Sequence, residues 1–206
     1  MLTRNDFLIR DDVVFFNHGS FGACPKDVFQ QYQMWQLELE RQPIEFLGRR
    51  RADLLQQATD VIAEFLNAPA EELMFVTNAT TGINTVAKSL KLSAGDQILT
   101  TDHEYGAIDK TMKFVAQKTD AEIVRYHVEV PYTTDEDFVD GLFAQVTDRT
   151  KVILLSHITS ASSLIFPVEA ICHRARELGI FTIIDGAHVP GQLPLDLSAI
   201  GADVYS

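Results

Sequence analysis

From Leu73 onward, the chain alternates between short apolar runs and longer segments with the periodicity of a helix. Runs of four or five mostly apolar or β-branched residues are typical of strands, and a longer segment with apolar residues three and four positions apart is typical of a helix. The runs that we expect to form strands are residues 73–76, 97–100, 122–126, 152–155 and 181–184. The segments that we expect to form helices are residues 82–92, 105–118, 135–146 and 168–178.

Strands and helices that alternate at this spacing predict repeated right-handed βαβ units. Each connection is long enough to bring the next strand back parallel to the previous one. We therefore expect an α/β fold with three layers, α-β-α, around a mainly parallel sheet.

The first part of the chain has a different pattern. A short extended apolar run at residues 13–16 is followed by Pro25, which suits the first turn of a helix. Apolar residues then repeat at helical spacing at Val28, Tyr32, Trp35 and Leu39, and a second helical stripe continues to Phe65. We expect a helical N-terminal arm over residues 1–67 and a large domain over residues 68–206.

The composition narrows the possible functions. The 206 residues are 46% hydrophobic and 22% charged, which is typical of a globular protein with a buried core. Seventeen Lys and Arg residues against 29 Asp and Glu residues give a formal net charge of −12, which disfavours nucleic acid as a partner. The sequence shows no secretory signal and no apolar run long enough for a membrane span, so we expect a cytoplasmic location.

The two cysteines, Cys24 and Cys172, belong to no metal-binding or disulfide pattern. We therefore expect free thiols and no metal site.

The first candidate functional residues follow the last of the predicted strands. Residues 181–184 are followed by Asp185, Gly186 and His188, and ligands of open α/β sheets bind beyond the carboxyl ends of the strands. A carboxylate in that position is costly to bury unless a cation or a hydrogen-bond donor meets it. For an isolated Asp-Gly pair, however, a simple turn cap is the commoner interpretation.

Other strand ends carry polar residues as well. Residues 77–82 place hydroxyl groups at an expected helix start, where free N–H groups and the helix dipole can hold a phosphate, although capping by Thr80 or Thr81 is the ordinary alternative. His103 and Tyr105 follow the second strand and could stack on a flat ring, although a lone histidine is more often structural.

A serine-rich and threonine-rich loop at residues 156–163 follows the fourth strand, and such a loop is usually only a connection. Together, however, the strand ends offer a phosphate site, a ring to stack on, hydroxyl donors and a carboxylate beside a histidine. Pyridoxal 5'-phosphate has the matching parts. Its chemistry needs a carboxylate that keeps the pyridine nitrogen protonated, and Asp185 fits that task.

Five motifs then identify a family. They are residues 16–22 (FNHGSFG), 77–82 (TNATTG), 102–105 (DHEY), 156–160 (SHITS) and 185–188 (DGAH). The chain resembles class V aminotransferases among the fold-type-I pyridoxal-phosphate enzymes, especially the isopenicillin N epimerase-like branch and the cysteine desulfurases. The resemblance implies an amino-acid substrate and a homodimer, and it makes residues 68–206 part of the cofactor-binding large domain.

The resemblance also implies roles for single residues, with Asp185 and His103 as the catalytic candidates. Ala79 and Thr80 would contact the cofactor phosphate, with Thr81 nearby. His103 would stack on the pyridine ring, with Tyr105 as a rival. Asp185 would pair with the pyridinium, while His188 and Ser160 would lie near the phenolic oxygen. Asn17 and His18 would belong to the substrate-side wall.

One departure from the family pattern is clear. Relatives carry the Schiff-base lysine shortly after the strand that begins here at Ala202, and this sequence stops at Ser206 without it. We therefore expect a fragment of a larger enzyme that does not turn over by itself, and we expect residues 73–76 to lack their neighbouring strand.

The expected function is an amino-acid transformation through an external aldimine and a quinonoid carbanion, with aminotransferase, epimerase or desulfurase and lyase outcomes all open. The alternative is a lysine-lacking, non-catalytic module that binds pyridoxal phosphate or another ligand. A nicotinamide-dependent enzyme is a third possibility, but the glycine fingerprint is missing.

Overall fold

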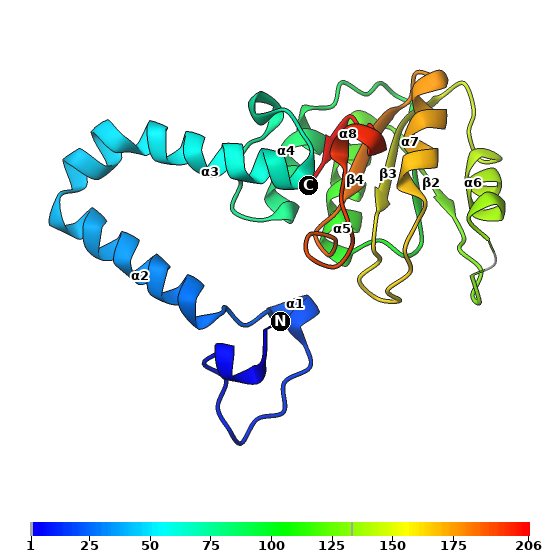
Figure 1. Cartoon of the computed structure of the whole chain (residues 1–206). Coiled ribbons are helices and arrows are strands. Elements are labelled where there is room, and N and C mark those ends of the chain that lie inside the picture. Colours follow the sequence, from blue (N-terminus) through cyan, green and yellow to red (C-terminus); the bar gives the residue numbers. More distant parts are fainter. Residues whose placement is uncertain (1, 133) are drawn as a thin grey trace. The chain divides into compact units, whose positions relative to one another are not determined.

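A computed structural model describes residues 2–132 and 134–206 (Figure 1). The chain divides into two compact units, one that ends at Val61 and one that comprises Ile62–Ser206. The division lies within helix α3 (Arg51–Leu66), a few residues before the expected domain boundary at residues 67 and 68. In the described part of the chain, none of the helices is long and apolar enough to cross a membrane.

The first unit is helical, as expected. It contains η1 (Arg4–Asp6), α1 (His18–Phe21), α2 (Lys26–Arg41), the π-helix η2 (Ile44–Arg50) and the first part of α3. Pro25 precedes α2, where its fixed backbone angle and missing N–H group cost the helix nothing. The apolar run at residues 13–16 forms neither a helix nor a strand.

The second unit is an α/β sheet structure. Its helices are η3 (Ala70–Glu72), α4 (Ala79–Ser89), α5 (Gly106–Thr119), α6 (Asp135–Phe143), α7 (Val168–Glu177) and α8 (Leu197–Ile200). Its strands are β1 (Gln97–Thr101), β2 (Glu122–Tyr126), β3 (Thr150–Ser156), β4 (Phe181–Asp185) and β5 (Val204–Tyr205). They form one parallel sheet in the order β2-β1-β3-β4-β5, so the predicted α/β class and parallel sheet are confirmed.

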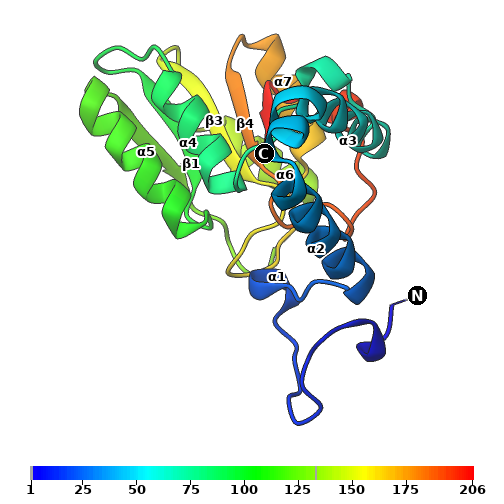
Figure 2. The same cartoon turned by 90° about the vertical axis from the view of Figure 1, so that its left-hand side faces the viewer.

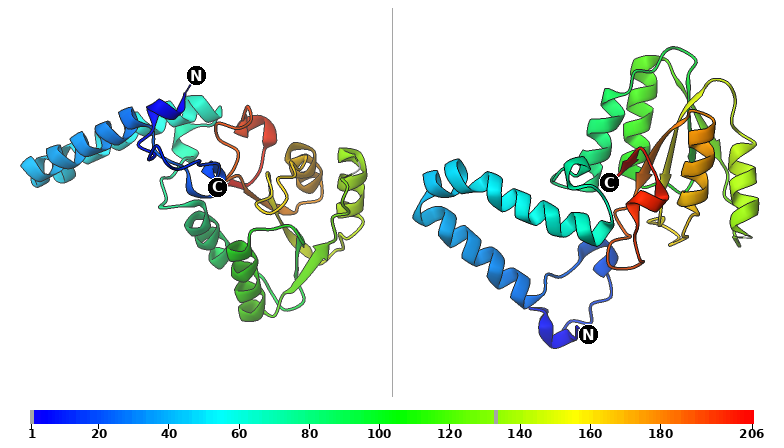
Figure 3. Two further views of the ribbon diagram at one scale, coloured as in Figure 1. Left: turned by 90° about the horizontal axis from the view of Figure 1, so that it is seen from below. Right: turned by 45° about the horizontal axis from the view of Figure 1, so that its top comes forward.

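The sheet is covered on both faces because successive strand residues point to opposite sides. On one face, Ile98, Leu154 and Ile183 pack against α4 and α5. On the other face, Leu155 and Ile184 pack with residues of α6, α7 and α8. Figure 2 and Figure 3 show α4 and α5 on one side of the sheet and α7 on the other. This arrangement makes the three expected layers.

The prediction of a strand at residues 73–76 is wrong. This segment follows η3 and adopts no strand conformation. A groove of about 660 Å³ separates it from β5, and Leu73, Met74, Val204 and Tyr205 are among the residues that line the groove. A strand needs a partner about 4.8 Å away to pair its backbone groups, and the described residues provide none here.

The strand order sets the place of a ligand site. From β1 the chain moves outward to β2, crosses back to β3, and continues in the opposite direction through β4 to β5. The order therefore reverses between β1 and β3. In open α/β sheets, ligands bind at this point, beyond the carboxyl ends of the strands.

Candidate functional site

Asp185 is the last residue of β4 and lies in register with Ser156 of β3. It is only 7% exposed, and its carboxylate accepts one hydrogen bond, from the Ala187 N–H at 3.1 Å. Burial raises the pKa of Asp185, while the bond from Ala187 and the nearby His188 act in the opposite direction. In the described part of the chain, no lysine or arginine forms an ion pair with this carboxylate. It is therefore a buried acid that lacks a full positive partner.

The residue after Asp185 must be small. Tyr205 of β5 lies against the Gly186 backbone so closely that a Cβ atom on Gly186 would overlap the phenol ring. The Tyr205 hydroxyl is 2.9 Å from Nδ1 of His157, which is buried at the end of β3. Burial raises the pKa of Tyr205, with the negative charge of Asp185 adding to the effect, and burial lowers the pKa of His157. A rigid aromatic pair thus supports the end of β4.

The start of α4 lies beside the same strand end. Asn78, rather than Thr80 or Thr81, caps this helix, because its side-chain oxygen accepts the Thr81 N–H at 2.8 Å. The first-turn N–H groups of Ala79 and Thr80 have no acceptor within the helix.

Ser206 connects this helix start to β4. Its hydroxyl donates to the Ala79 carbonyl at 3.3 Å, and its N–H donates to the Ile184 carbonyl at 3.0 Å. The backbone donors of α4 and the carboxylate of Asp185 therefore share one edge of the sheet.

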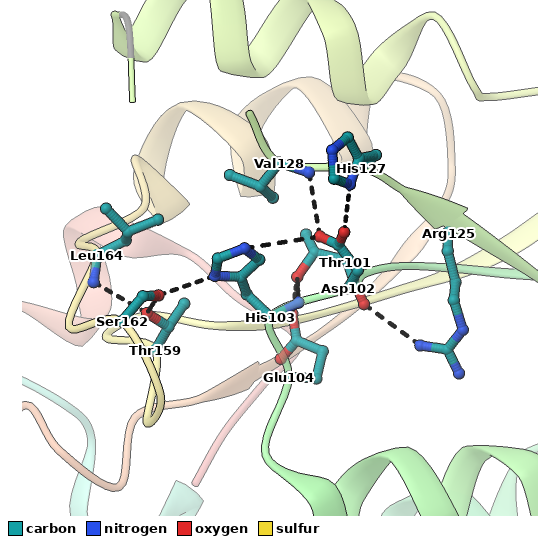
Figure 4. A network of polar contacts seen from close by, with 10 residues as sticks. All are labelled: Thr101, Asp102, His103, Glu104, Arg125, His127, Val128, Thr159, Ser162 and Leu164. Atoms are coloured by element: carbon teal, nitrogen blue, oxygen red, sulfur yellow. Dashed lines mark hydrogen bonds and ion pairs between the residues drawn. The ribbon is translucent and has the colours of Figure 1, made fainter. Parts of the chain in front are cut away.

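His103 lies in the loop after β1 and is held from two sides (Figure 4). Its Nδ1 atom is 2.8 Å from the Ser162 hydroxyl, and its Nε2 atom is 3.9 Å from an Asp102 carboxylate oxygen. Asp102 also accepts the Val128 N–H at 3.0 Å and contacts Nδ1 of His127 at 2.5 Å. Burial opposes the ionisation of Asp102, but these hydrogen bonds and the histidines hold its pKa below the usual value.

Glu104 lies at the same strand ends and was not among the candidate residues predicted from the sequence. Its Oε1 atom accepts the Thr101 hydroxyl at 2.6 Å, and its Oε2 atom accepts both the N–H and the hydroxyl of Ser156 at 2.7 Å. Burial raises the pKa of Glu104 to about 7; these hydrogen bonds oppose the shift and the charge of Asp185 adds to it. Glu104 thereby joins the ends of β1 and β3, between which the strand order reverses. Its signal in the sequence is a polar residue just beyond a buried strand.

The remaining candidates lie around these residues. Tyr105 precedes α5 and is 48% exposed, Ser160 is exposed in the turn after β3, and His188 is partly buried beside Asp185. The Thr81 hydroxyl accepts a hydrogen bond from the Thr77 hydroxyl at 3.1 Å.

Asn17 and His18 belong to the first unit. The Asn17 side chain caps α1 by accepting the Ser20 N–H at 3.3 Å, and the His18 ring packs edge-on against Phe15 with centroids 4.7 Å apart. Within that unit both residues have structural contacts of their own.

The family described as aminotransferase class-V matches residues 22–206. The chain belongs to this family. The predicted resemblance is therefore confirmed, and the sheet with its strand-end residues is the framework of a class V aminotransferase family member.

Two kinds of relative are similar to this family member. It is 34% identical to isopenicillin N epimerase of Streptomyces clavuligerus over 98% of this chain and 51% of the relative. It is 29% identical to a putative L-cysteine desulfhydrase 1 of Oryza sativa subsp. japonica over 92% of this chain and 42% of the relative. The chain thus spans about half the length of the curated relatives that it matches.

Solved structures share the fold. The complex of the cystine C-S lyase C-DES with cysteine persulfide matches with a TM-score of 0.86 at 24% identity, over 93% of this chain and 52% of that chain. A C-DES variant with glycine covalently linked to its PLP cofactor matches with a TM-score of 0.90 at 23% identity, over all of this chain and 55% of that chain.

Proposed function

We propose that this member of the class V aminotransferase family binds pyridoxal phosphate and forms the cofactor-binding part of an enzyme that acts on an amino acid. The observation that carries the proposal is the buried Asp185 carboxylate, which forms no ion pair with a lysine or arginine among the described residues. A protonated pyridine nitrogen would supply the missing positive charge. When bound, pyridoxal phosphate supplies an electron sink for the negative charge that develops at the α-carbon of the substrate.

The start of α4 would hold the phosphate group. The N–H groups of Ala79 and Thr80 are free of intrahelical acceptors, and the positive end of the helix dipole favours an anion there. The Thr81 hydroxyl lies in the same turn and can contribute a further hydrogen bond. Because Ser206 joins this turn to β4, one ligand can reach both the helix start and Asp185.

The remaining residues would position the ring and the substrate. We assign the ring-stacking role to His103, because it is held on two sides whereas Tyr105 is half exposed. Ser160 and His188 would lie near the phenolic oxygen. Asn17 and His18 would contact the substrate in the assembled enzyme.

The relatives named as epimerase, desulfhydrase and lyase support an amino-acid substrate with an epimerisation or lyase outcome. Amino transfer, after which the family is named, stays open as a third outcome. We further propose that the enzyme is a homodimer. In the first unit, α2 buries none of its residues and exposes Val28, Tyr32 and Trp35, which are spaced to share one side of the helix and give an apolar surface for a second copy to cover.

Cofactor titration tests the proposal. Wild-type protein is titrated with pyridoxal phosphate and, separately, with pyridoxal, and binding is followed by absorbance after equilibrium dialysis. We expect saturable binding of the phosphorylated compound and at least tenfold weaker binding of pyridoxal, because charged hydrogen bonds contribute about 1.5 to 3 kcal/mol each. Equal affinities would contradict the assigned phosphate site.

Borohydride reduction of the protein purified from its natural source, after it has bound pyridoxal phosphate, separates the enzyme from the lysine-lacking alternative. A stable adduct on one defined lysine, located by peptide mass analysis, supports the enzyme. Saturable binding that leaves no adduct after reduction supports the non-catalytic binding module.

A further inference from the structure

The loop after β3 contacts the His103 ring through a short series of side chains (Figure 4). Thr159 Oγ1 accepts the Leu164 N–H at 2.9 Å and lies 2.7 Å from the Ser162 hydroxyl. The Ser162 hydroxyl lies 2.8 Å from His103 Nδ1. Two loops on either side of the point where the strand order reverses are therefore joined by hydroxyl groups.

The hydrogen bonds in this series have a direction. Thr159 is only 1% exposed, so its hydroxyl proton must find an acceptor inside the protein, and Ser162 Oγ is the one at hydrogen-bond distance. Ser162 then uses its own proton on His103 Nδ1. A neutral imidazole that accepts at Nδ1 carries its proton at Nε2, and this atom faces the Asp102 carboxylate.

We propose that Ser162 is a positioning residue that fixes both the ring orientation and the neutral tautomer of His103. The inference rests on the proposed function, in which the His103 ring stacks on the cofactor. Ser162 is itself exposed, so replacing it by alanine leaves no cavity, but the change also removes the acceptor of the buried Thr159 hydroxyl and should cost about 1 to 3 kcal/mol of stability. Weaker cofactor binding by Ser162→Ala is therefore assigned to the orientation of the ring only when the His103 tautomer changes with it and urea unfolding shows the variant to be folded.

The first arm of the test is nitrogen NMR of the histidine rings without ligand. Spectra of ¹⁵N-labelled wild-type protein are recorded at a pH where they show the His103 ring to be neutral, with the signals assigned by their loss in His103→Gln. We expect the proton on Nε2 in the wild type and a mixture of tautomers in Ser162→Ala. Ser162→Thr, which keeps the hydroxyl, should restore the wild-type pattern.

The second arm is the affinity for pyridoxal phosphate. Ser162→Ala should weaken binding about five- to tenfold, the effect of losing one ordinary hydrogen bond, and Ser162→Thr should recover it. Ser163→Ala is the matched control, because Ser163 is an exposed neighbour in the same loop. It should leave the affinity and the His103 signals unchanged.

The two arms separate two kinds of failure. A wild-type ring protonated on Nδ1, or His103 signals that are the same in wild type and Ser162→Ala, would overturn the role of Ser162. A wild-type protein that binds no pyridoxal phosphate would overturn the proposed function, and the NMR arm would still decide whether Ser162 orients the ring.

Discussion

Replacing Glu104 by glutamine should make the protein more stable at high pH relative to wild type. The carboxylate of Glu104 is partly buried between β1 and β3, and burial raises its pKa to about 7 from an ordinary value of 4.5. Between pH 4.5 and 7, Glu104 is therefore protonated in the folded protein but already ionised in the unfolded chain. As a result, the contribution of Glu104 to stability is fully present below pH 4.5 and is lost as the pH rises through 7.

The size of this effect follows from the pKa. Each tenfold change in proton affinity corresponds to about 1.4 kcal/mol. The unfolding free energy of wild type should therefore fall by about 3 kcal/mol as Glu104 changes from protonated to ionised. Glutamine has nearly the same shape and no ionisation, so the variant lacks this loss. Asp185 is present in both proteins, and its own contribution largely cancels from their difference.

The assay is urea unfolding followed by circular dichroism from pH 4.5 to 8.5. The unfolding free energy of Glu104→Gln minus that of wild type should rise by about 3 kcal/mol across the range. Glu122→Gln is the control, since hydrogen bonds from Gln97 and Arg149 lower the pKa of Glu122, so its contribution to stability is lost only as the pH falls below 4.5 and its difference from wild type should stay nearly constant from pH 5.5 to 8.5. A constant difference between Glu104→Gln and wild type would refute the assignment of Glu104 as a buried acid that destabilises when ionised.

Three further changes test the structure around the site by the same unfolding assay. Leu155→Ala should cost about 2 to 5 kcal/mol of unfolding free energy because Leu155 is fully buried in the core. Leu178→Ala, at a position that is 56% exposed, should cost far less, and equal losses of stability in the two variants would contradict the packing. Asn78→Ala should cost about 1 kcal/mol through loss of the α4 cap, and an unchanged stability would count against that cap. Gly186→Ala should cost about 1 to 3 kcal/mol because its Cβ would overlap the Tyr205 ring. Gly106→Ala is the control and should leave the stability nearly unchanged, because the Cβ position of Gly106 lies in open space. A Gly186→Ala variant as stable as wild type would show that Tyr205 lies elsewhere.

Strands β1, β3 and β4 were predictable because each is largely buried on both faces. Residues 152–155 and 181–184 form β3 and β4 with small changes at their ends. Residues 73–76 have the same local character but no neighbour to pair with, and it was the family resemblance, not the local pattern, that predicted the missing neighbour. An apolar run therefore predicted a strand correctly only where the sheet supplied a neighbouring strand.

The candidate site was predictable to the extent that its residues follow strands. Asp185 and His103 were predicted because an acid or a histidine directly after a buried strand lies where ligands of open α/β sheets bind. The place of Glu104 and the proposed role of Ser162 were not predicted, because they depend on partners 52 and 59 positions away along the chain. Such contacts are set by the strand order, and the reversal between β1 and β3 becomes visible only in the folded sheet.

The central claim is that Asp185 pairs with the protonated ring nitrogen of pyridoxal phosphate. The most direct test measures the affinities of wild type and Asp185→Asn for pyridoxal phosphate and for its deaza analogue, in which carbon replaces that nitrogen. Wild type should prefer pyridoxal phosphate by about 30-fold or more, since breaking a buried charge pair costs at least about 2 kcal/mol, and Asp185→Asn should lose the preference. The control Asp148→Asn, at an exposed position before β3, should keep it. Equal binding of the two compounds by wild type, or an unchanged preference in Asp185→Asn, would contradict the claim.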